Sequence, residues 1–146
     1  MADEFYQYNP ELVVANWFGI PIQGVAAGSF MRCEYDEDAV VKTVGGQGAV
    51  TATVNANRAG RFTFTLEQGS ETNTLLAQYA ASNRARGAAL IAKPFLLRDL
   101  GGLTICEAAY AWILRVPPAE FGKEALGREW VLDIADLNLK LAGNIL

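Results

Sequence analysis

Short stretches of alternating hydrophobic and polar residues recur along the chain. The clearest alternation lies at 49–69, AVTATVNANRAGRFTFTLEQG. Each half places an apolar side chain at every second position, which is the period of a β-strand with one buried face and one hydrated face. The connection at 55–60 contains two Asn and one Gly, residues that favour tight turns. The pattern predicts a β-hairpin with a threonine-rich hydrated face.

Further strands are predicted on both sides of this hairpin. The turn Gly19-Ile20-Pro21 favours a hairpin whose second strand lies at the edge of a sheet. The Asp-Leu-Gly-Gly turn within 98–102 predicts another hairpin, and the β-branched and aromatic residues that follow it favour a strand over a helix. The other extended segments are expected at 12–17, 30–35, 39–44, 88–97, 103–115 and 129–139.

One segment, 70–82, has a helical period. Ser70 or Thr72 is a candidate N-cap, and Gly87 is a candidate stop signal. One face of this helix is expected to carry Leu75, Leu76, Tyr79 and Ala80.

About seven strands and one helix predict a mainly β fold. We expect two packed antiparallel sheets, or a β-barrel-like sandwich, with one flanking α-helix. No repeat or linker divides the chain, so 1–146 is expected to be a single domain. Its irregular parts are expected to be an N-terminal arm at about 1–11 and an extended loop at about 36–48.

Composition narrows the class of protein. Hydrophobic residues make up 51% of the chain, which excludes a disordered tail. The net charge of −4 argues against a protein that grips nucleic acid, since phosphate binding needs clustered Lys and Arg. The first residues lack the pattern of a secretory signal, so synthesis in the cytoplasm is expected.

The candidate chemistry is sparse. Because the chain has no His, nucleophile–histidine pairs and histidine metal sites are excluded. The glycine-rich segment 45–48 lacks the Lys of a phosphate-binding loop, and the acidic segment 36–38 lacks the spacing of a calcium loop. Asp133 and Asp136 are expected to be exposed carboxylates rather than an acid–base pair. The sequence therefore predicts no catalytic residue, cofactor or metal.

Cys33 and Cys106 lie far apart in the sequence. A disulfide between them is an alternative, but reduced residues in the core are the favoured expectation.

Several segments together resemble the tail tube proteins of contractile-tailed bacteriophages. The most specific are 59–68, which leads into a Ser/Asn-rich helix start, and 120–130. One departure from the family is the order Lys93-Pro94-Phe95, where Phe-Pro is expected. The matching runs, which cover nearly the whole chain, are GIPI, FMRCEYDEDAVVKTVGGQG, NRAGRFTFTLEQGSETNTLLA, RDLGG, AAYAWI and EFGKEALGREWVLDIADLNL.

The resemblance implies two orthogonal β-sheets with a flanking helix. It implies hexameric rings that stack into the inner tube of a virion tail, with strands of neighbouring subunits joined around a channel. The implied partners are other copies of the chain, the tail sheath protein, the tape measure protein in the lumen, and the baseplate and tail terminator proteins. DNA would pass through the channel without specific binding on its way into the host.

Three groups of residues are candidates for contacts in such a tube. The polar face expected to line the channel consists of Thr51, Thr53, Arg61, Thr63, Thr65 and Glu67, and we expect a net negative lumen that does not retain DNA phosphates. Contacts between rings are expected from the N-terminal arm and from Asp36, Glu37, Asp38, Val41, Lys42, Gly45, Gly46 and Gln47. Contacts with the sheath are expected from the helix and from Lys123, Glu124 and Arg128.

Other functions remain open at this level. A tube of a tailocin or a secretion-like contractile injection system would use the same features. A small-ligand-binding β-barrel would need an apolar interior pocket rather than a threonine-rich face, and an enzyme would need a constellation that the sequence lacks. Deletion of 41–47 is expected to leave soluble subunits that no longer polymerise.

Overall fold

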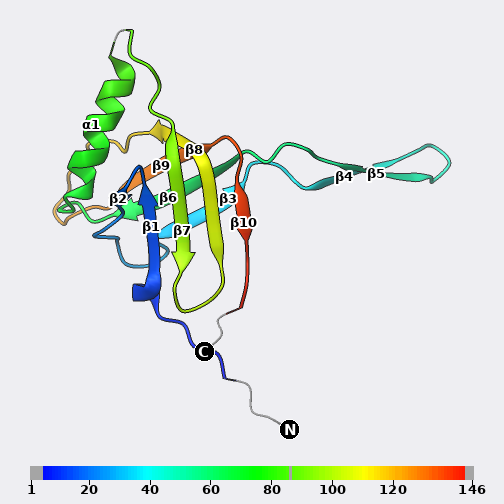
Figure 1. Cartoon of the computed structure of the whole chain (residues 1–146), viewed down its shortest axis with the longest axis horizontal. Coiled ribbons are helices and arrows are strands. Elements are labelled where there is room, and N and C mark those ends of the chain that lie inside the picture. The colour runs from blue at the N-terminus through cyan, green and yellow to red at the C-terminus, as the bar shows by residue number, and fades with distance from the viewer. Residues whose placement is uncertain (1–4, 86, 144–146) are drawn as a thin grey trace.

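The computed structural model describes residues 5–85 and 87–143, and antiparallel strands dominate them (Figure 1). A short 3-10 helix, Pro10–Leu12, precedes the first strand, and the single α-helix of the described residues is α1 (Thr72–Arg84). The strands are β1 (Val13–Trp17), β2 (Ile20–Pro21), β3 (Met31–Tyr35), β4 (Val40–Val44), β5 (Val50–Val54), β6 (Gly60–Leu66), β7 (Lys93–Asp99), β8 (Ile105–Arg115), β9 (Arg128–Ile134) and β10 (Asn138–Lys140).

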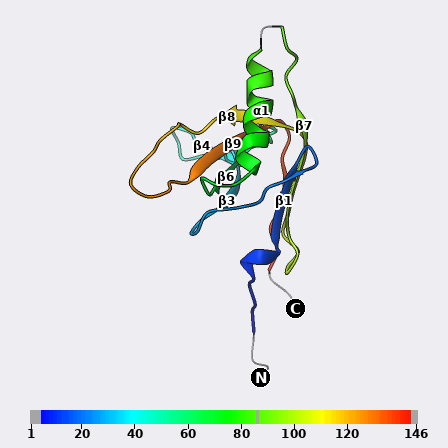
Figure 2. The same ribbon diagram turned by 90° about the vertical axis from the view of Figure 1, so that its left-hand side faces the viewer.

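Eight strands form one folded-over sheet in the order β2-β1-β7-β8-β9-β6-β3, with β10 paired to β8. The long strand β8 pairs with strands of both layers of this sheet. Its first half, up to Ala111, pairs with β7 and β10, whereas its second half, from Ala111 onward, pairs with β9. In Figure 1, β1, β7, β8 and β10 run upright, and β9, β6 and β3 cross behind them; Figure 2 shows the two layers from the side. The predicted mainly β sandwich with one flanking helix is confirmed.

Aromatic side chains fill the space between the two layers. Phe62 of β6 lies 4.6 Å from Phe95 of β7 and 5.1 Å from Phe64, measured between ring centroids. Trp17 is fully buried, and its indole N–H donates to the carbonyl oxygen of Ala111 at 2.9 Å. Burial of such large apolar surfaces is the main favourable contribution to folding.

The helix α1 covers one end of the sandwich (Figure 1). Leu76 and Ala80 are buried, and Tyr79 meets Trp17 edge-on at 5.7 Å, so most of the predicted helical face is confirmed. Leu75 is the exception, because its side chain is exposed. The N-cap is Glu71 and not the predicted Ser70 or Thr72, although the Ser70 hydroxyl accepts a hydrogen bond from the backbone N–H of Thr72 at 3.3 Å.

Two predicted hairpins are present. Strands β1 and β2 pair through Asn16 with Pro21, and β2 is at the edge of the sheet, as the proline predicts. Strands β7 and β8 pair around the turn after Asp99, although β7 begins only at Lys93, later than the predicted segment.

The predicted hairpin of the two segments within 49–69 is wrong. Strand β5 pairs with β4, and β6 lies between β3 and β9. Alternation identifies a strand and its faces but does not identify its partner. The closing turn is 45–48, where the Gly45 N–H donates to the Ala49 carbonyl at 2.7 Å and Gly48 has a φ of 85°. The segment 55–59 instead carries the chain back to the sandwich.

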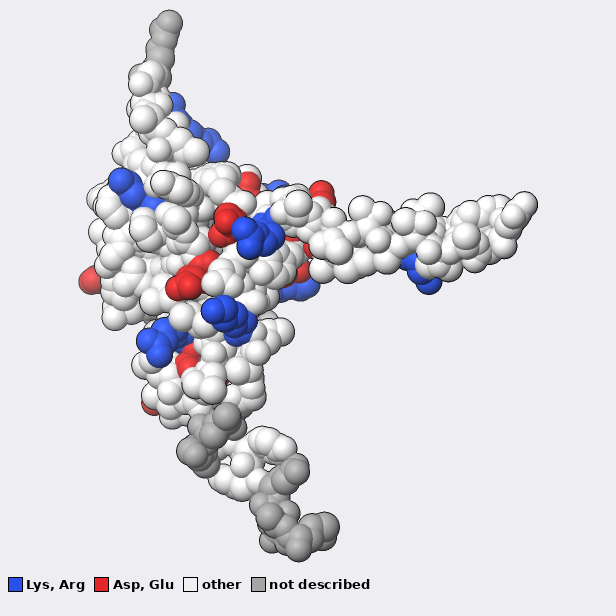
Figure 3. All heavy atoms as spheres, turned by 45° about the vertical axis from the view of Figure 1, so that its right-hand side comes forward, with Lys and Arg blue, Asp and Glu red and all other residues white. Residues whose placement is uncertain are grey.

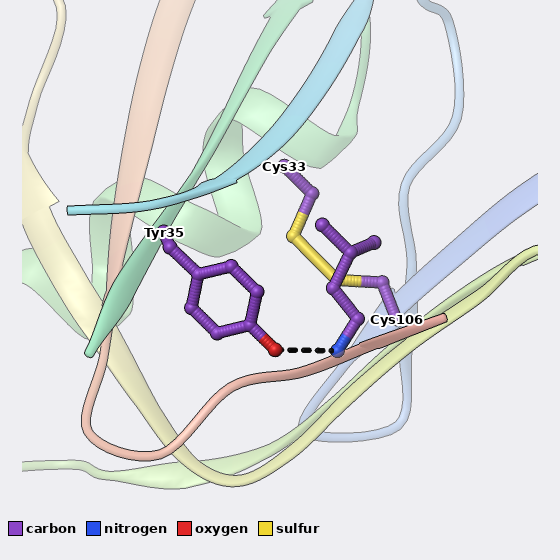
Figure 4. Close-up of a disulfide and its surroundings, with 4 residues drawn as sticks. Cys33, Tyr35 and Cys106 are labelled. Carbon is purple, nitrogen blue, oxygen red and sulfur yellow. Dashed lines mark hydrogen bonds between the residues drawn. A yellow bond between two sulfur atoms is a disulfide. The ribbon is translucent and has the colours of Figure 1, made fainter. Parts of the chain in front are cut away.

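A disulfide joins Cys33 of β3 to Cys106 of β8, which corrects the expectation of two reduced thiols (Figure 4). It connects the edge strand β3 of one layer to β8, with which β3 does not pair. Beside it, the Tyr35 hydroxyl accepts a hydrogen bond from the Leu139 N–H at 3.2 Å. The disulfide thus holds β3 against β8 and the Tyr35 hydroxyl holds it against β10, two strands with which β3 has no main-chain ladder.

Candidate assembly surface

The hairpin of β4 and β5 projects away from the sandwich as a separate two-stranded sheet (Figures 1 and 3). All ten residues of these two strands are exposed. A two-stranded ribbon is marginally stable in water by itself, because each residue has too few packing partners. This hairpin is therefore the part of the molecule that most clearly lacks a partner surface in the described chain.

The strand register gives the hairpin two different faces. Paired residues of antiparallel strands point to the same side, so one side collects the pairs Val40–Val54, Lys42–Ala52 and Val44–Val50, which we call the valine face. The other side, the threonine face, collects the pairs Val41–Thr53 and Thr43–Thr51. In Figure 3 the hairpin is almost free of charged atoms; Lys42 is the one charged residue of the two strands.

Hydrogen bonds at the base fix where the hairpin leaves the sandwich. The Asn55 side-chain amide donates to the Glu37 carboxylate at 2.7 Å and to the Asp38 carbonyl at 3.2 Å. The Asn55 bond to the carboxylate, and after it a bond from the Asn57 side chain, hold the pKa of Glu37 below its usual range. Arg61 of β6 pairs with Asp36 at 3.5 Å, so the base is tied to the sheet as well.

Apart from the N-terminal arm, the residues predicted to contact the next ring belong to this hairpin or to its base. Within the expected extended loop at 36–48, the strand β4 confirms the extended segment predicted at 39–44. The acidic segment 36–38 lies at the base, and the glycine-rich turn lies at the tip. Val41 is on the threonine face and Lys42 is on the valine face.

The residues predicted to line a channel are divided between two places. Arg61, Thr63 and Thr65 lie on the outer face of β6, opposite its buried phenylalanines. Thr51 and Thr53 lie on the threonine face of the hairpin, and Glu67 follows the end of β6. They do not form one continuous pair of strands, because β5 and β6 are not neighbours.

The outer face around β6 is rich in charge. Cross-strand partners of its polar residues include Arg32 and Glu34 on β3, and Glu129 and Asp133 on β9. Arg32 and Glu34 form an exposed ion pair at 3.1 Å. Together with Arg61 and Asp36, this face has two arginines against four carboxylates.

The loop predicted to face a sheath is held by one of its own residues. The Arg128 guanidinium donates to the carbonyl oxygens of Glu120 at 2.9 Å and Pro118 at 3.4 Å, and it lies 5.2 Å from the Phe121 ring. Lys123 and Glu124 are exposed. Arg128 therefore shapes the loop, whereas Lys123 and Glu124 carry its outward charge.

A second apolar surface lies at the end of the sandwich formed by the β7–β8 turn, and sequence reasoning missed it. The Leu100 N–H donates to the Leu12 carbonyl at 2.9 Å, and the Thr104 hydroxyl exchanges hydrogen bonds of 3.0 Å with the Ala142 main chain. The segments that these bonds join carry four exposed leucines, which we call the leucine patch: Leu12, Leu100, Leu103 and Leu141. The available signal was the Leu-Gly-Gly-Leu sequence at 100–103, where a solvated turn would carry polar side chains.

The N-terminal arm is described from Phe5 onward; residues 1–4 of the predicted arm lie outside the described residues. Phe5 and Tyr8 are both exposed, ahead of the 3-10 helix. Within the described residues, no group of three or more His, Cys, Asp or Glu side chains is placed to hold a metal ion. In the same part of the chain, no helix has the length and apolar character needed to cross a bilayer.

Comparison with known proteins shows where this fold occurs. No family model matches the chain. Structural protein ORF10 of Pseudomonas phage KPP10 is 26% identical over 123 residues, which are 84% of this chain and 71% of that protein.

Solved structures with the same fold come from phage-like particles. A sheath/tube terminator of an extracellular contractile injection system, PVC, has a TM-score of 0.60 at 13% identity, covering 94% of this chain and 99% of that chain. The tube-terminating cap of the anti-feeding prophage has a TM-score of 0.60 at 10% identity, covering 95% of each. A chain from the virion of a native gene transfer agent has a TM-score of 0.64 at 12% identity, covering 92% of this chain and 100% of that chain.

At these identities the solved structures establish a shared fold. Their sources and the phage structural protein agree with the expected location in a virion tail. The chain has the fold of components of phage-like tail particles and is similar in sequence to a phage structural protein.

Proposed function

We propose that this chain is a structural subunit of the inner tube of a contractile phage tail. Copies assemble into hexameric rings that stack around a channel through which DNA leaves for the host. The resemblance of the sequence segments to tail tube proteins supports this function, and so do the shared fold and the similarity to a phage structural protein.

The single observation that carries the proposal is the β4–β5 hairpin. All of its residues are exposed, and four of the six residues on its valine face are valines. A subunit that acted alone would leave this apolar ribbon in water, which favours association. The hairpin and its base, with Asp36, Glu37, Asp38, Val41, Lys42, Gly45, Gly46 and Gln47, form the contact with the next ring.

The channel wall in this proposal combines the outer face of β6 with the threonine face of the hairpin. Its residues are Thr51, Thr53, Arg61, Thr63, Thr65 and Glu67. The excess of carboxylates beside Arg61 supports a net negative wall, along which phosphates slide without being retained. The tape measure protein occupies this lumen during assembly.

The outer surface of the tube in this proposal carries α1 and the loop before β9. Lys123 and Glu124 are exposed there and are available to pair with charges on the sheath protein. Arg128 contributes by holding the loop in shape. Such exposed pairs contribute only about 0–1 kcal/mol each, so the sheath contact depends on many repeated copies. The baseplate and the tail terminator contact the two ends of the tube.

A second candidate function is a terminator ring at the end of such a tube. The observation that favours it is the near-complete overlap with the PVC sheath/tube terminator and the anti-feeding prophage cap. A terminator forms a single ring, whereas a tube subunit continues to stack. A tube of a tailocin or another contractile injection system would stack in the same way as a phage tube.

A small-ligand-binding barrel is disfavoured by the interior of the sandwich. The space between the layers is occupied by the rings of Phe62, Phe64, Phe95, Trp17 and Trp130, all with 2% exposure or less. A ligand pocket would need an open apolar cavity there.

Electron microscopy of the purified full chain over a range of concentrations tests the proposal. Hollow tubes of indefinite length support the tube subunit, and single rings that do not stack support the terminator. Monodisperse monomers at every concentration would contradict both functions.

A further inference from the structure

We infer that the Cys33–Cys106 disulfide is a redox-sensitive cross-link, in which Cys33 exchanges with small thiols and disulfides and Cys106 is its buried partner. The oxidised pair fixes the edge strand β3 and the base of the β4–β5 hairpin, and the reduced pair lets β3 open separately from the rest of the sandwich. The inference goes beyond the proposed function, because it concerns a single subunit and applies equally to a tube subunit and to a terminator.

The two sulfurs lie in different surroundings. Cys106 has no exposed surface, and the strand register places it between Leu97 of β7 and Leu139 of β10. Cys33 is partly exposed; its cross-strand partner on β6 is Phe62, and none of the described strands pairs with the other edge of β3. A small thiol therefore reaches Cys33 from the edge of the sheet, whereas Cys106 is enclosed by strands on both sides.

This difference in access assigns the order of the exchange reaction. A small thiolate attacks the Cys33 sulfur, a mixed disulfide forms there, and the Cys106 sulfur leaves as a thiolate and takes up a proton. A second small thiolate attacks the outer sulfur of the mixed disulfide, which releases a small-molecule disulfide and the Cys33 thiolate. Oxidation by a small-molecule disulfide, such as oxidised glutathione, passes through the same mixed disulfide in reverse.

Strand β3 depends strongly on this cross-link. It has a main-chain ladder only with β6. Within the described residues, its covalent and hydrogen-bonded links to the layer of β7, β8 and β10 are the disulfide and the bond from the Leu139 N–H to the Tyr35 hydroxyl (Figure 4). One exposed hydrogen bond stabilises little. Reduction therefore leaves β3 weakly held on that side.

The same strand leads directly into the base of the hairpin. Tyr35, the last residue of β3, is followed by Asp36, whose N–H donates to the Ala59 carbonyl at 3.0 Å and whose carboxylate pairs with Arg61. Cys33 lies just before these residues on the same segment. The cross-link consequently anchors the strand from which the hairpin leaves the sandwich.

The surroundings of the subunit determine which state is present. Disulfides persist under oxidising conditions, and cellular thiols reduce them where a sulfur is accessible. The partly exposed Cys33 gives such thiols access in the folded protein. The inference therefore predicts reduction without global unfolding.

Single-cysteine variants of the full chain test which sulfur exchanges. Cys106→Ala retains Cys33, and Cys33→Ala retains Cys106. Each folded variant is incubated with oxidised glutathione, mass spectrometry measures the glutathione adduct, and circular dichroism verifies folding. We expect the Cys106→Ala variant to form the adduct at least about tenfold faster, because access limits exchange. In urea the two variants should react at similar rates. Equal rates in the folded variants, or faster reaction of Cys33→Ala, would overturn the assignment.

Hydrogen exchange of the unmodified chain, measured before and after reduction by dithiothreitol, tests the structural consequence. The ratio of exchange rates between the amides of β3 and those of β7 is expected to rise at least about tenfold on reduction, because β3 opens separately. The variant Cys33→Ala/Cys106→Ala is the control and should not respond to the reductant.

Two results of this second experiment would overturn the inference. An unchanged ratio would mean that the disulfide only stabilises the fold as a whole. Reduction at the rate of global unfolding would mean that Cys33 is not accessible in the folded protein. Neither experiment measures assembly, so these results would leave the proposed function intact.

Discussion

Gly60 is the glycine of the described residues with the least room for a side chain. A Cβ at this residue would lie 2.5 Å from Cδ2 of Leu137 and 2.6 Å from the carbonyl oxygen of Glu34. Because the second contact is with main chain, β3 or β6 would have to move. Gly60→Ala is expected to destabilise the fold by about 1–3 kcal/mol through overpacking. Urea unfolding measures this loss of stability. Gly46→Ala serves as the control, because a Cβ at Gly46 would have no atom within 4 Å. Equal stabilities for the two variants would contradict this packing.

The Cys33–Cys106 disulfide joins residues 73 positions apart in the chain. Closing a loop of this length restricts the unfolded chain and is expected to stabilise the fold by about 4 kcal/mol. Adding a reductant should therefore lower the unfolding midpoint of the unmodified protein. The variant Cys33→Ala/Cys106→Ala should start at the lower value and not respond to the reductant. An unmodified protein with two freely reactive thiols would contradict the cross-link.

Glu37 makes the base of the hairpin sensitive to acid. Its carboxylate accepts a hydrogen bond from Asn55, and its pKa lies below the usual glutamate range. A lowered pKa in the folded state means that the bond contributes fully above the ordinary pKa of about 4.3 and is lost as pH falls through the lowered value. The Asn55 side-chain NMR signals should titrate with a midpoint below that of an exposed glutamate.

Glu37→Gln provides the control for this titration, because the amide oxygen still accepts the Asn55 bond but has no proton to gain. Its Asn55 signals should stay constant over the same acid range. A midpoint at or above the ordinary glutamate value in the unmodified protein would mean that the bond is absent in solution.

At the scale of elements, the sequence predicts most strands and the helix but not how they pair. The alternation in 129–134 correctly places Trp130, Leu132 and Ile134 on the buried face. The same alternation in β5 suggests a core face for Val50 and Val54, and the structure exposes both. The pattern records which side is apolar, but it does not distinguish a core from a partner surface. The valines of β5 therefore led to a wrong prediction of its partner strand. The same valines, because they are exposed, indicate the candidate assembly surface.

The helix illustrates a second limit of sequence reasoning. Leu75 and Leu76 are adjacent, and both fit an apolar helical face, yet only Leu76 packs into the core. The disulfide could not be predicted from the sequence either, because its two residues meet only after the sheet folds over and brings β3 to β8. Long-range closure of this kind leaves no local pattern in the sequence.

Removing the hairpin as a unit tests its role as an element. Because β4 pairs with β5, deletion of 41–47 alone would leave β5 without its partner. Replacing 41–53 by a short Asn-Gly turn is the cleaner change. The shortened chain is expected to keep its unfolding midpoint, since the sandwich core contains no hairpin residue, but to remain monomeric. Tubes formed by the shortened chain would show that the hairpin is dispensable.

At the scale of the whole molecule, a well-packed sandwich carries exposed apolar surfaces of the kind that subunits bury when they assemble. The core is filled with aromatic rings, and the two layers are joined by a disulfide and by the Tyr35 hydroxyl. Outside this core lie an apolar hairpin, a leucine patch and a face rich in carboxylates. A rigid body with two different apolar surfaces is suited to repeated head-to-tail contacts.

Hydrogen exchange of the β4–β5 amides, compared between dilute monomers and concentrated protein, tests the central claim most directly. In the monomer the exposed ribbon is expected to exchange fast, because a two-stranded sheet opens easily. In the assembled protein, docking on a neighbouring copy is expected to slow the exchange of β4 and β5 strongly. Fast exchange of both strands in assembled particles, or a chain that stays monomeric at every concentration, would contradict the account.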